Sequence, residues 1–218
     1  MITGKRIISQ TNTALDYVTL AEAKQHLRVT SSSDDTYITG LIGMALDACS
    51  QYLGYNVIKS SVRFGFDGFT GLPSLINPVN GTQLPSGNFL RIPSRILSLT
   101  SVNYVNESNA VTEFDAADWI SAPEPLANYG RDIFFNTAPT SLTDDRTKYI
   151  VQCVEGFELT SATADFGDKF PQGIKFAALL LIAQYYDNRA AVTTSSGMKP
   201  LDFGLKYMLD PYKIEVFI

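Results

Sequence analysis

The sequence of 218 residues predicts an α+β fold, in which a small helical bundle carries an inserted antiparallel β region. Two observations lead to this prediction. Apolar residues recur at helical spacing in the first quarter of the chain and again in its last third. Between these parts, short β-branched and aromatic segments alternate with turn-forming residues, a pattern typical of antiparallel strands. The hydrophobic fraction of 45% is ordinary for a globular chain and sufficient for a core.

Residues 1–16 are polar and show no apolar period, so we interpret them as an N-terminal arm. The first helix is predicted at about residues 20–27. Thr19 and Glu22 stand at the spacing of a capping box, in which each side chain accepts a hydrogen bond from a backbone N–H that the first helical turn leaves unpaired. This pair predicts where the helix begins.

A second helix is predicted at residues 34–53. Asp34 and Asp35 place carboxylates at its start, where they can cap backbone N–H groups and where the helix dipole favours negative charge. Gly54 follows at the position where a left-handed backbone conformation often ends a helix. The apolar stripe of this helix consists of Ile38, Leu41, Ile42, Ala45, Cys49, Tyr52 and Leu53.

An antiparallel β region is predicted as an insertion over residues 61–155. Residues 68–88, rich in Gly and Pro, separate its first two strands, and a loop of that length is unusual in a compact domain and commonly functional or disordered. The predicted strands lie at residues 61–67, 89–92, 97–105, 119–120, 132–135 and 149–155.

The last third predicts helices at about residues 171–190 and 201–209, so that residues 17–60 and 156–209 together form the helical domain. Pro171 stands where a proline is tolerated in the first helical turn. The helix at 171–190 is apolar on nearly all sides and therefore needs cover on nearly all sides. A second subunit is the simplest cover, and we expect it to pack on Phe176, Leu179, Leu180 and Ala183.

Residues 210–218 form an apolar C-terminal tail that we interpret as a strand. The tail can dock on a neighbouring chain or pack on its own subunit, and the sequence leaves both alternatives open. Its candidate contact residues are Tyr212, Ile214, Val216, Phe217 and Ile218.

The charge of the chain favours a protein that assembles with other proteins. Lys and Arg number 17 and Asp and Glu number 22, a net charge of −5, and only 18% of the residues are charged. A low charged fraction suits a partly buried surface, because interface cores are depleted in charge. The sequence contains no cluster of Lys and Arg, and this speaks against non-specific nucleic-acid binding. We expect no signal peptide and no membrane span, because no apolar run approaches the ~20 residues that a span needs.

No motif predicts a catalytic, cofactor or metal site, and we expect a protein that is not an enzyme. His26 is the only histidine, and the sequence marks no nucleophile or acid to work with it. Cys49 and Cys153 make neither a disulfide framework nor a zinc spacing. The acidic pairs, interpreted as a helix cap and two turns rather than metal ligands, are Asp34 with Asp35, Asp115 with Asp118, and Asp144 with Asp145.

Five segments, taken in chain order, form a recognisable set. They are VTLAEAKQHLRV at 18–29, the second helix with its closing Tyr-Leu-Gly at 52–54, RIPSRILSLTSVNYV at 91–105, the helix from Pro171 to Tyr-Tyr-Asp-Asn-Arg at 185–189, and Leu-Asp-Pro-Tyr at 209–212. Over residues 17–212 this set resembles the head–tail connector (adaptor) family of tailed bacteriophages. The arm at 1–16 and the loop at 68–88 have no counterpart in that resemblance, and Lys213 stands where an arginine is more usual.

The resemblance implies a structural protein in the neck of the virion, with no cofactor. It implies a ring of twelve copies beneath the portal protein, which extends the DNA channel and offers a docking platform for the next neck or tail protein. DNA is then expected to pass through without specific binding. The net negative charge suits such passage, because few cations would pair with the phosphates, and we expect an acidic lumen.

Two alternatives stay open at this point. The chain could be another neck or tail component, such as a head-completion or tail-terminator protein, although the two strong helices speak against a mostly β tail terminator. It could also be a small acidic enzyme or regulator. The single histidine, the lack of converging carboxylates and the lack of a basic face speak against that second alternative.

Overall fold

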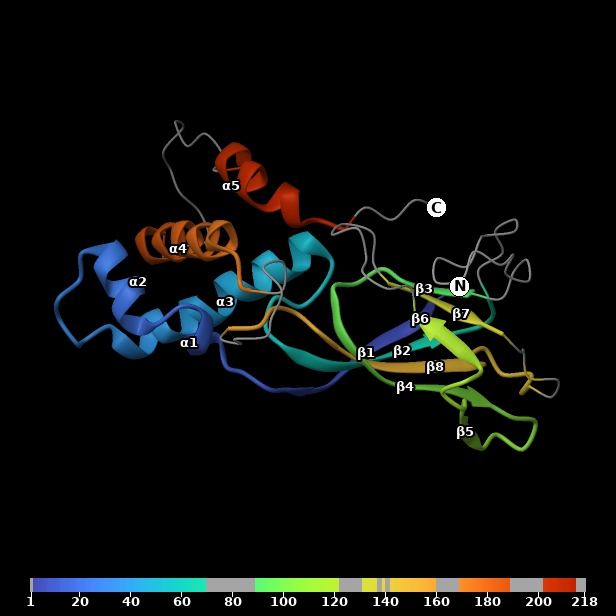
Figure 1. The fold of residues 1–218 in the computed structure, drawn as a ribbon. Coiled ribbons are helices and arrows are strands. Elements are labelled where there is room, and N and C mark those ends of the chain that lie inside the picture. Colours follow the sequence, from blue (N-terminus) through green and yellow to red (C-terminus); the bar gives the residue numbers. More distant parts are fainter. Residues whose placement is uncertain are drawn as a thin grey trace. The chain divides into compact units, whose positions relative to one another are not determined.

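The computed structural model describes residues 2–69, 89–121, 131–136, 139, 142–159, 169–188 and 202–214 (Figure 1). The chain divides into two compact units. The β unit comprises Met1–Gln10, Ser60–Glu155 and Ile214–Ile218, and the helical unit comprises Thr11–Lys59 and Gly156–Lys213. Each unit therefore combines segments that lie far apart in the sequence.

The chain contains both helices and antiparallel strands, which confirms the predicted α+β class. In the helical unit, the helices predicted near 20–27, 34–53, 171–190 and 201–209 are all present. The last of these leads into a single 3-10 turn, whereas the sequence analysis predicts a strand from residue 210. That prediction is wrong for the first three residues, because Pro211 fits the start of a helical turn. The elements are α1 (Ala14–Tyr17), α2 (Leu20–Leu27), α3 (Asp35–Leu53), α4 (Gln172–Asp187), α5 (Asp202–Leu209) and η2 (Asp210–Tyr212).

The predicted end signals of α2 and α3 are mostly confirmed. The backbone N–H of Glu22 donates to Thr19 Oγ1 at 3.2 Å, and the N–H of Thr19 donates to Glu22 Oε2 at 2.9 Å, which is the predicted capping box. Gly54 closes α3 with φ of +81°. Asp34 is the N-cap residue of α3 as predicted, but the predicted hydrogen bond from its side chain is wrong, because the carboxylate accepts from Tyr186 Oη at 2.5 Å and makes no capping bond to α3.

The core of the helical unit lies between α3 and α4. Tyr17 adds a polar centre to it: its hydroxyl donates to the Phe157 carbonyl at 2.9 Å and accepts from the Lys59 backbone N–H at 2.8 Å. The predicted stripe of α3 is buried apart from Tyr52. The buried residues of the two helices are Ile38, Leu41, Ile42, Ala45, Leu46, Cys49 and Leu53 on α3, and Ile174, Ala177, Ala178, Leu181 and Ile182 on α4.

The β unit contains two antiparallel sheets. One has five strands in the order β1-β2-β8-β4-β5 and the other has three in the order β3-β7-β6. The larger apolar core of this unit draws on both sheets and includes Phe64, Ile92, Val102, Phe135 and Val151, while Phe89 and Phe134 form a separate small cluster. The strands are β1 (Ile2–Gln10), β2 (Ser60–Phe66), β3 (Phe89–Ile92), β4 (Ile96–Val105), β5 (Val111–Glu113), β6 (Trp119–Ser121), β7 (Arg131–Phe135) and β8 (Tyr149–Glu155).

The interpretation of residues 1–16 as an arm is wrong. Residues Ile2–Gln10 form β1, which pairs with β2 along one edge of the five-stranded sheet, and Ala14–Tyr17 form α1. β1 is joined through its backbone, and its side chains from Thr3 to Gln10 are exposed, so the strand has no buried face to impose an alternating pattern. β5 escapes prediction for a related reason, since it has only three residues and two of them are exposed.

Of the predicted loop at 68–88, only residues 68 and 69 belong to the part of the chain that the structure describes. Among the contact residues predicted for the tail, Val216, Phe217 and Ile218 lie outside the described residues.

Candidate functional site

The predicted packing residues of α4 lie on the face that α3 leaves uncovered. Phe176 is 48% exposed, and Leu179, Leu180 and Ala183 are half-buried. These four residues follow a spacing of three, four and seven from the first, so they form one stripe along the helix. The buried residues of α4 occupy the other positions. An apolar stripe that the described residues cover only in part is a candidate surface for another chain.

A groove in the helical unit lies at the start of this stripe. Its volume is about 480 Å³, and it is lined by residues of α2, α4 and α5. Phe176 forms one wall, with the ring of His26 edge-on to it at 6.0 Å between centroids. The lining residues are Glu22, Gln172, Gly173, Lys175, Phe176, Leu179 and Met208.

One ion pair marks the polar side of the groove. Lys175 Nζ lies 2.5 Å from Glu22 Oε1, and Glu22 also belongs to the capping box with Thr19. Burial by itself raises the pKa of the Glu22 carboxyl, but the hydrogen bonds from Lys175 and Thr19 outweigh it and hold that pKa below its ordinary value. The groove therefore combines an apolar wall with a fixed charge pair, which suits the recognition of a protein surface.

Other apolar side chains of the helical unit are exposed as well. Tyr207 of α5 is 74% exposed, and Met44 and Tyr37 of α3 are 56% and 38% exposed. Single exposed apolar residues are ordinary on a protein surface, but the stripe of α4 and Tyr207 of α5 belong to two helices that pack on each other.

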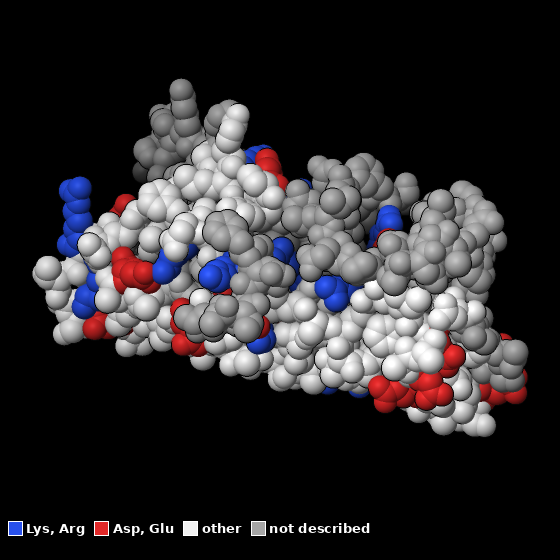
Figure 2. All heavy atoms as spheres, viewed as in Figure 1, with Lys and Arg blue, Asp and Glu red and all other residues white. Residues whose placement is uncertain are grey.

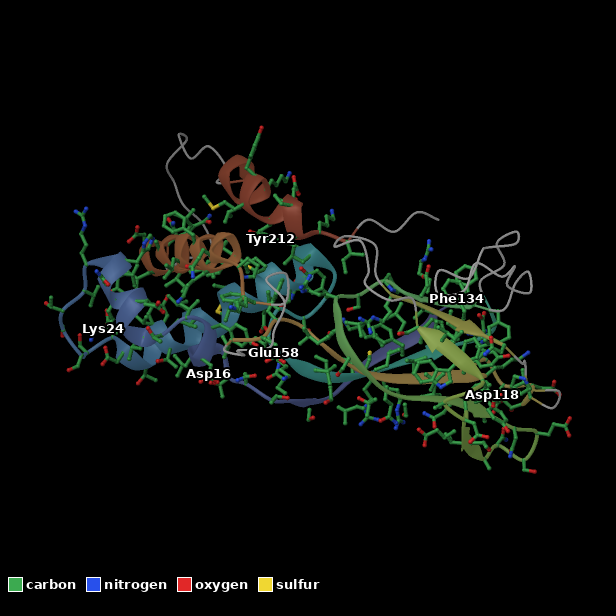
Figure 3. All side chains as sticks on the ribbon, viewed as in Figure 1. Asp16, Lys24, Asp118, Phe134, Glu158 and Tyr212 are labelled. Carbon is green, nitrogen blue, oxygen red and sulfur yellow. The ribbon has the colours of Figure 1, made fainter. Side chains whose placement is uncertain are left out.

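The C-terminal segment is held by its own helical unit as far as Lys213. Tyr55 Oη donates to the Tyr212 carbonyl at 2.8 Å, and Tyr52 Oη donates to Asp210 Oδ1 at 2.5 Å. The Tyr212 ring approaches α4 at Gly173, where a Cβ atom would lie 3.0 Å from Tyr212 Oη (Figure 3). Ile214 is half-buried. The expectation that the tail touches a neighbouring chain therefore rests on Ile214 and the residues after it, and it stays a prediction.

The cysteines and the acidic pairs lie in surroundings that explain them as parts of the fold. Burial raises the pKa of the Cys49 and Cys153 thiols to about 12, so neither is a thiolate near neutral pH. The other acidic pairs fit turns, since the backbone N–H of Asp118 donates to the Asp115 carbonyl and that of Asp145 donates to Thr143 Oγ1. Among the described residues, no group of three or more His, Cys, Asp or Glu could hold a metal ion.

The pairing of Glu22 with Lys175 could not be read from the sequence. The two residues lie 153 positions apart, and neither stands in a motif that points to the other. The fold also brings Met208 of α5 into the groove, a placement that the sequence of this helix of eight residues does not indicate. Within the described part of the chain, no helix has the length and apolar character needed to cross a membrane.

Comparisons with known proteins agree with the resemblance seen in the sequence. Residues 17–116 match the family model of the phage gp6-like head-tail connector proteins. This stretch begins at the last residue of α1 and ends just after β5. No curated protein matches the chain.

Two solved structures share the fold over nearly the whole chain. One is a chain from the neck of an empty gene transfer agent (GTA) particle computed with C6 symmetry, with a TM-score of 0.66 and 16% identity over 99% of this chain and 98% of that chain. The other is a chain from the virion of a native GTA particle, with a TM-score of 0.63 and 16% identity over 98% of this chain and 97% of that chain. Residues 17–116, a little under half of the chain, are thus similar to the phage gp6-like head-tail connector proteins, the family that the sequence itself resembles.

Proposed function

We propose that this chain is a structural adaptor at the head–tail interface of a phage-like particle. Copies of it form a ring under the portal protein, extend the DNA channel and provide the docking platform for the next neck or tail protein. The observation that carries this proposal is the fold shared with a chain of the GTA neck over 99% of this chain, combined with the connector-family match.

The surface of the helical unit supports assembly into a ring. The α4 stripe (Phe176, Leu179, Leu180 and Ala183) leaves apolar area in water that a neighbouring copy can bury. We propose twelve copies per ring, a number compatible with the C6 symmetry used for the GTA neck when two copies fill each sixfold repeat.

A structural role needs no reaction chemistry from the chain. The two thiols carry raised pKa values, and the ring of His26 lies against Phe176. We therefore propose that the protein is not an enzyme and takes no cofactor. The net charge of −5 favours an acidic lumen, through which DNA passes with few cations to pair with its phosphates.

The proposal is tested by mixing the purified chain with the portal protein of the same particle. Light scattering gives the mass before and after mixing, and negative-stain images show the shape. We expect a ring, formed alone or on the portal. A monomer that ignores the portal would contradict the adaptor function, and binding to a tail component instead would move the protein to another layer of the neck or tail.

A further inference from the structure

The five-stranded sheet of the β unit carries opposite charges at its two edges. At one edge, β1 and β2 contain Lys5, Arg6 and Arg63 and no Asp or Glu. At the other edge, residues 106–115, which form the turn after β4, β5 and the two residues beyond it, contain Glu107, Glu113 and Asp115 and no Lys or Arg. The strand order β1-β2-β8-β4-β5 separates the two groups by the width of the sheet.

The basic edge holds two arginines in an unfavourable arrangement. Arg6 and Arg63 are direct partners in the register of β1 and β2, and both are exposed. Like charges directly opposite each other on neighbouring strands destabilise a sheet. Neither arginine forms an ion pair with another described residue. Two guanidinium groups are therefore free to bind anions supplied from outside the β unit.

Lys5 has a different role from the two arginines. Its Nζ atom lies 2.8 Å from Glu155 Oε1, a carboxylate that is completely buried and also accepts a hydrogen bond from Ser94. This ion pair holds the edge strand β1 against β8, and it leaves Arg6 and Arg63 as the available charges.

The acidic edge is equally unpaired. Glu107, Glu113 and Asp115 are exposed, and none of them has an ion-pair partner among the residues that the structure describes. Figure 2 shows acidic side chains gathered at the end of the β unit where Figure 1 places β5. The backbone N–H of Thr143 donates to the Val105 carbonyl at 3.0 Å and so places residues 144–146 beside this edge. All three are exposed, and they add the carboxylates of Asp144 and Asp145 and the guanidinium of Arg146.

The register places the opposite charges on one face of the sheet. Arg63 lies two residues before Gly65, so their side-chain directions agree. Gly65 pairs with Ile150, Ile150 with Asn103, and Asn103 with Glu113, and directly paired residues share a face. Glu113 and the Arg6–Arg63 pair therefore lie on the same face, opposite to the one that packs into the core of the β unit.

Within the described residues, both outer strands of the five-stranded sheet have one unpaired edge. β1 has nine residues, a length at which an unpaired edge readily accepts another strand. The four antiparallel steps from β1 to β5 make these two strands run in the same direction. In a neighbouring copy related by rotation, β1 can therefore lie alongside β5 of the first copy. A contact of this kind, between two different surfaces, closes into a ring when the rotation allows it.

We propose that the β1–β2 edge of one copy docks on the β5 edge of the next copy, with Arg6 and Arg63 facing Glu107 and Glu113. The inference rests on the proposed ring and names one of its interfaces. Charge complementarity within a single chain favours a second copy as the occupant. DNA is a less suitable occupant, because two arginines on a face that also carries Glu113 make a narrow basic surface in a chain of net charge −5.

Paired charge reversals test the proposal. The first variant carries Arg6→Glu and Arg63→Glu, and the second carries Glu107→Lys and Glu113→Lys. In each variant alone, both edges have the same sign, so we expect the concentration needed for half-assembly to rise by about tenfold or more. An equal mixture should assemble again, because alternating copies restore opposite charges at every contact.

A charge-conserving variant, Arg6→Lys with Arg63→Lys, is the matched control and should assemble as the wild type does. Circular dichroism and melting temperature establish that each variant folds, which we expect because all four positions are exposed. Assembly of either reversal variant at the wild-type concentration would overturn the docking inference and leave the adaptor function standing. If the arginine reversals change only the binding of a DNA duplex and not assembly, the docking inference is likewise overturned. A wild-type chain that never forms a ring, even on the portal, would reject the adaptor function itself.

Discussion

The helical unit and the β unit expose different kinds of surface. The helical unit leaves an apolar stripe on α4 partly in water, while the β unit buries most of its large apolar residues between two sheets and exposes charged side chains at its edges, together with Ile7, Ile8 and Val111. Apolar area supplies most of the free energy of association, whereas charge supplies orientation and excludes wrong partners. The difference teaches that one chain can divide these two tasks between separate parts of its fold.

The two units also differ in how their distant segments are tied together. In the helical unit, hydrogen bonds of partly exposed side chains link them, as between Tyr186 and Asp34 or between Tyr52 and Asp210. In the β unit, the ladder of the sheet does this work, and Glu155 is a completely buried carboxylate within it.

The largest expected effect concerns that carboxylate. Replacing Glu155 by Ala removes the partner of Lys5 and of Ser94 inside the β unit, so we expect the free energy of unfolding to fall by about 3–5 kcal/mol in a urea titration. The control is Glu158→Ala in the helical unit, whose ion pair with Lys59 is partly exposed and whose loss should cost less than about 1 kcal/mol. Equal losses for the two variants would contradict the contrast between the units.

The next effect lies where the chain returns to the helical unit. Gly156 has φ of +111°, and a Cβ atom there would lie 2.9 Å from the backbone of Ile58. We expect Gly156→Ala to lower the free energy of unfolding by about 2–3 kcal/mol, because strain and steric overlap add. Gly40→Ala in α3 is the matched control: it meets no atom within 4 Å and should stabilise the helix by up to about 1 kcal/mol. A melting temperature unchanged by Gly156→Ala would show that the backbone relaxes.

A third substitution separates association from folding. Phe176→Ala removes a half-exposed ring from the α4 stripe, so its cost in unfolding free energy should stay below about 1 kcal/mol. We expect ring formation on the portal to weaken by about tenfold or more, because buried interface aromatics carry much of the binding free energy. Ile174→Ala on the buried face of α4 should instead lower stability by about 2–5 kcal/mol. Unchanged assembly by the Phe176 variant would remove the α4 stripe from the ring interface.

The smallest effect is a pH dependence at Glu22. Its pKa is lower in the folded chain than in the unfolded chain, so the carboxylate stabilises the fold above its ordinary pKa. That contribution is lost as the pH falls through the lowered, folded-state pKa. We expect Glu22→Gln to be less stable than wild type at neutral pH and to lose less stability on acidification, as measured by thermal melts across pH 3–7. Parallel acid profiles for the two proteins would contradict this assignment.

The sequence predicted the parts of the fold whose cause is local. The stripe of α3, the capping box of α2 and the glycine at the end of α3 all depend on residues a few positions apart, and their positions were confirmed. The apolar excess of α4 likewise indicated a helix that needs more cover than α3 provides, and Phe176 is indeed half-exposed in the single chain.

The rest of the fold depends on long-range contacts that leave no local pattern. β1 was missed because the strand is held by backbone pairing and by the ion pair of Lys5 with the buried Glu155, neither of which imposes an apolar period. The charge difference between the sheet edges was hidden for the same reason, since Arg6 and Arg63 become neighbours only when β1 pairs with β2. The predicted capping bond of Asp34 failed because Tyr186, far away in the sequence, competes for its carboxylate.

The Tyr17 hydroxyl joins the carbonyl of Phe157 to the backbone N–H of Lys59, and this has a consequence for how the protein is made. A ribosome delivers residues 11–59 long before Phe157 leaves its exit tunnel. Residues 11–59, the first half of the helical unit, therefore remain incompletely folded, with part of their apolar surface exposed, while the strands from β2 to β8 are synthesised and can fold. Closure of the helical unit is a late, long-range event, and contacts of this kind slow folding. A nascent chain stalled before α4 should bind chaperones, and release should follow once α4 has emerged.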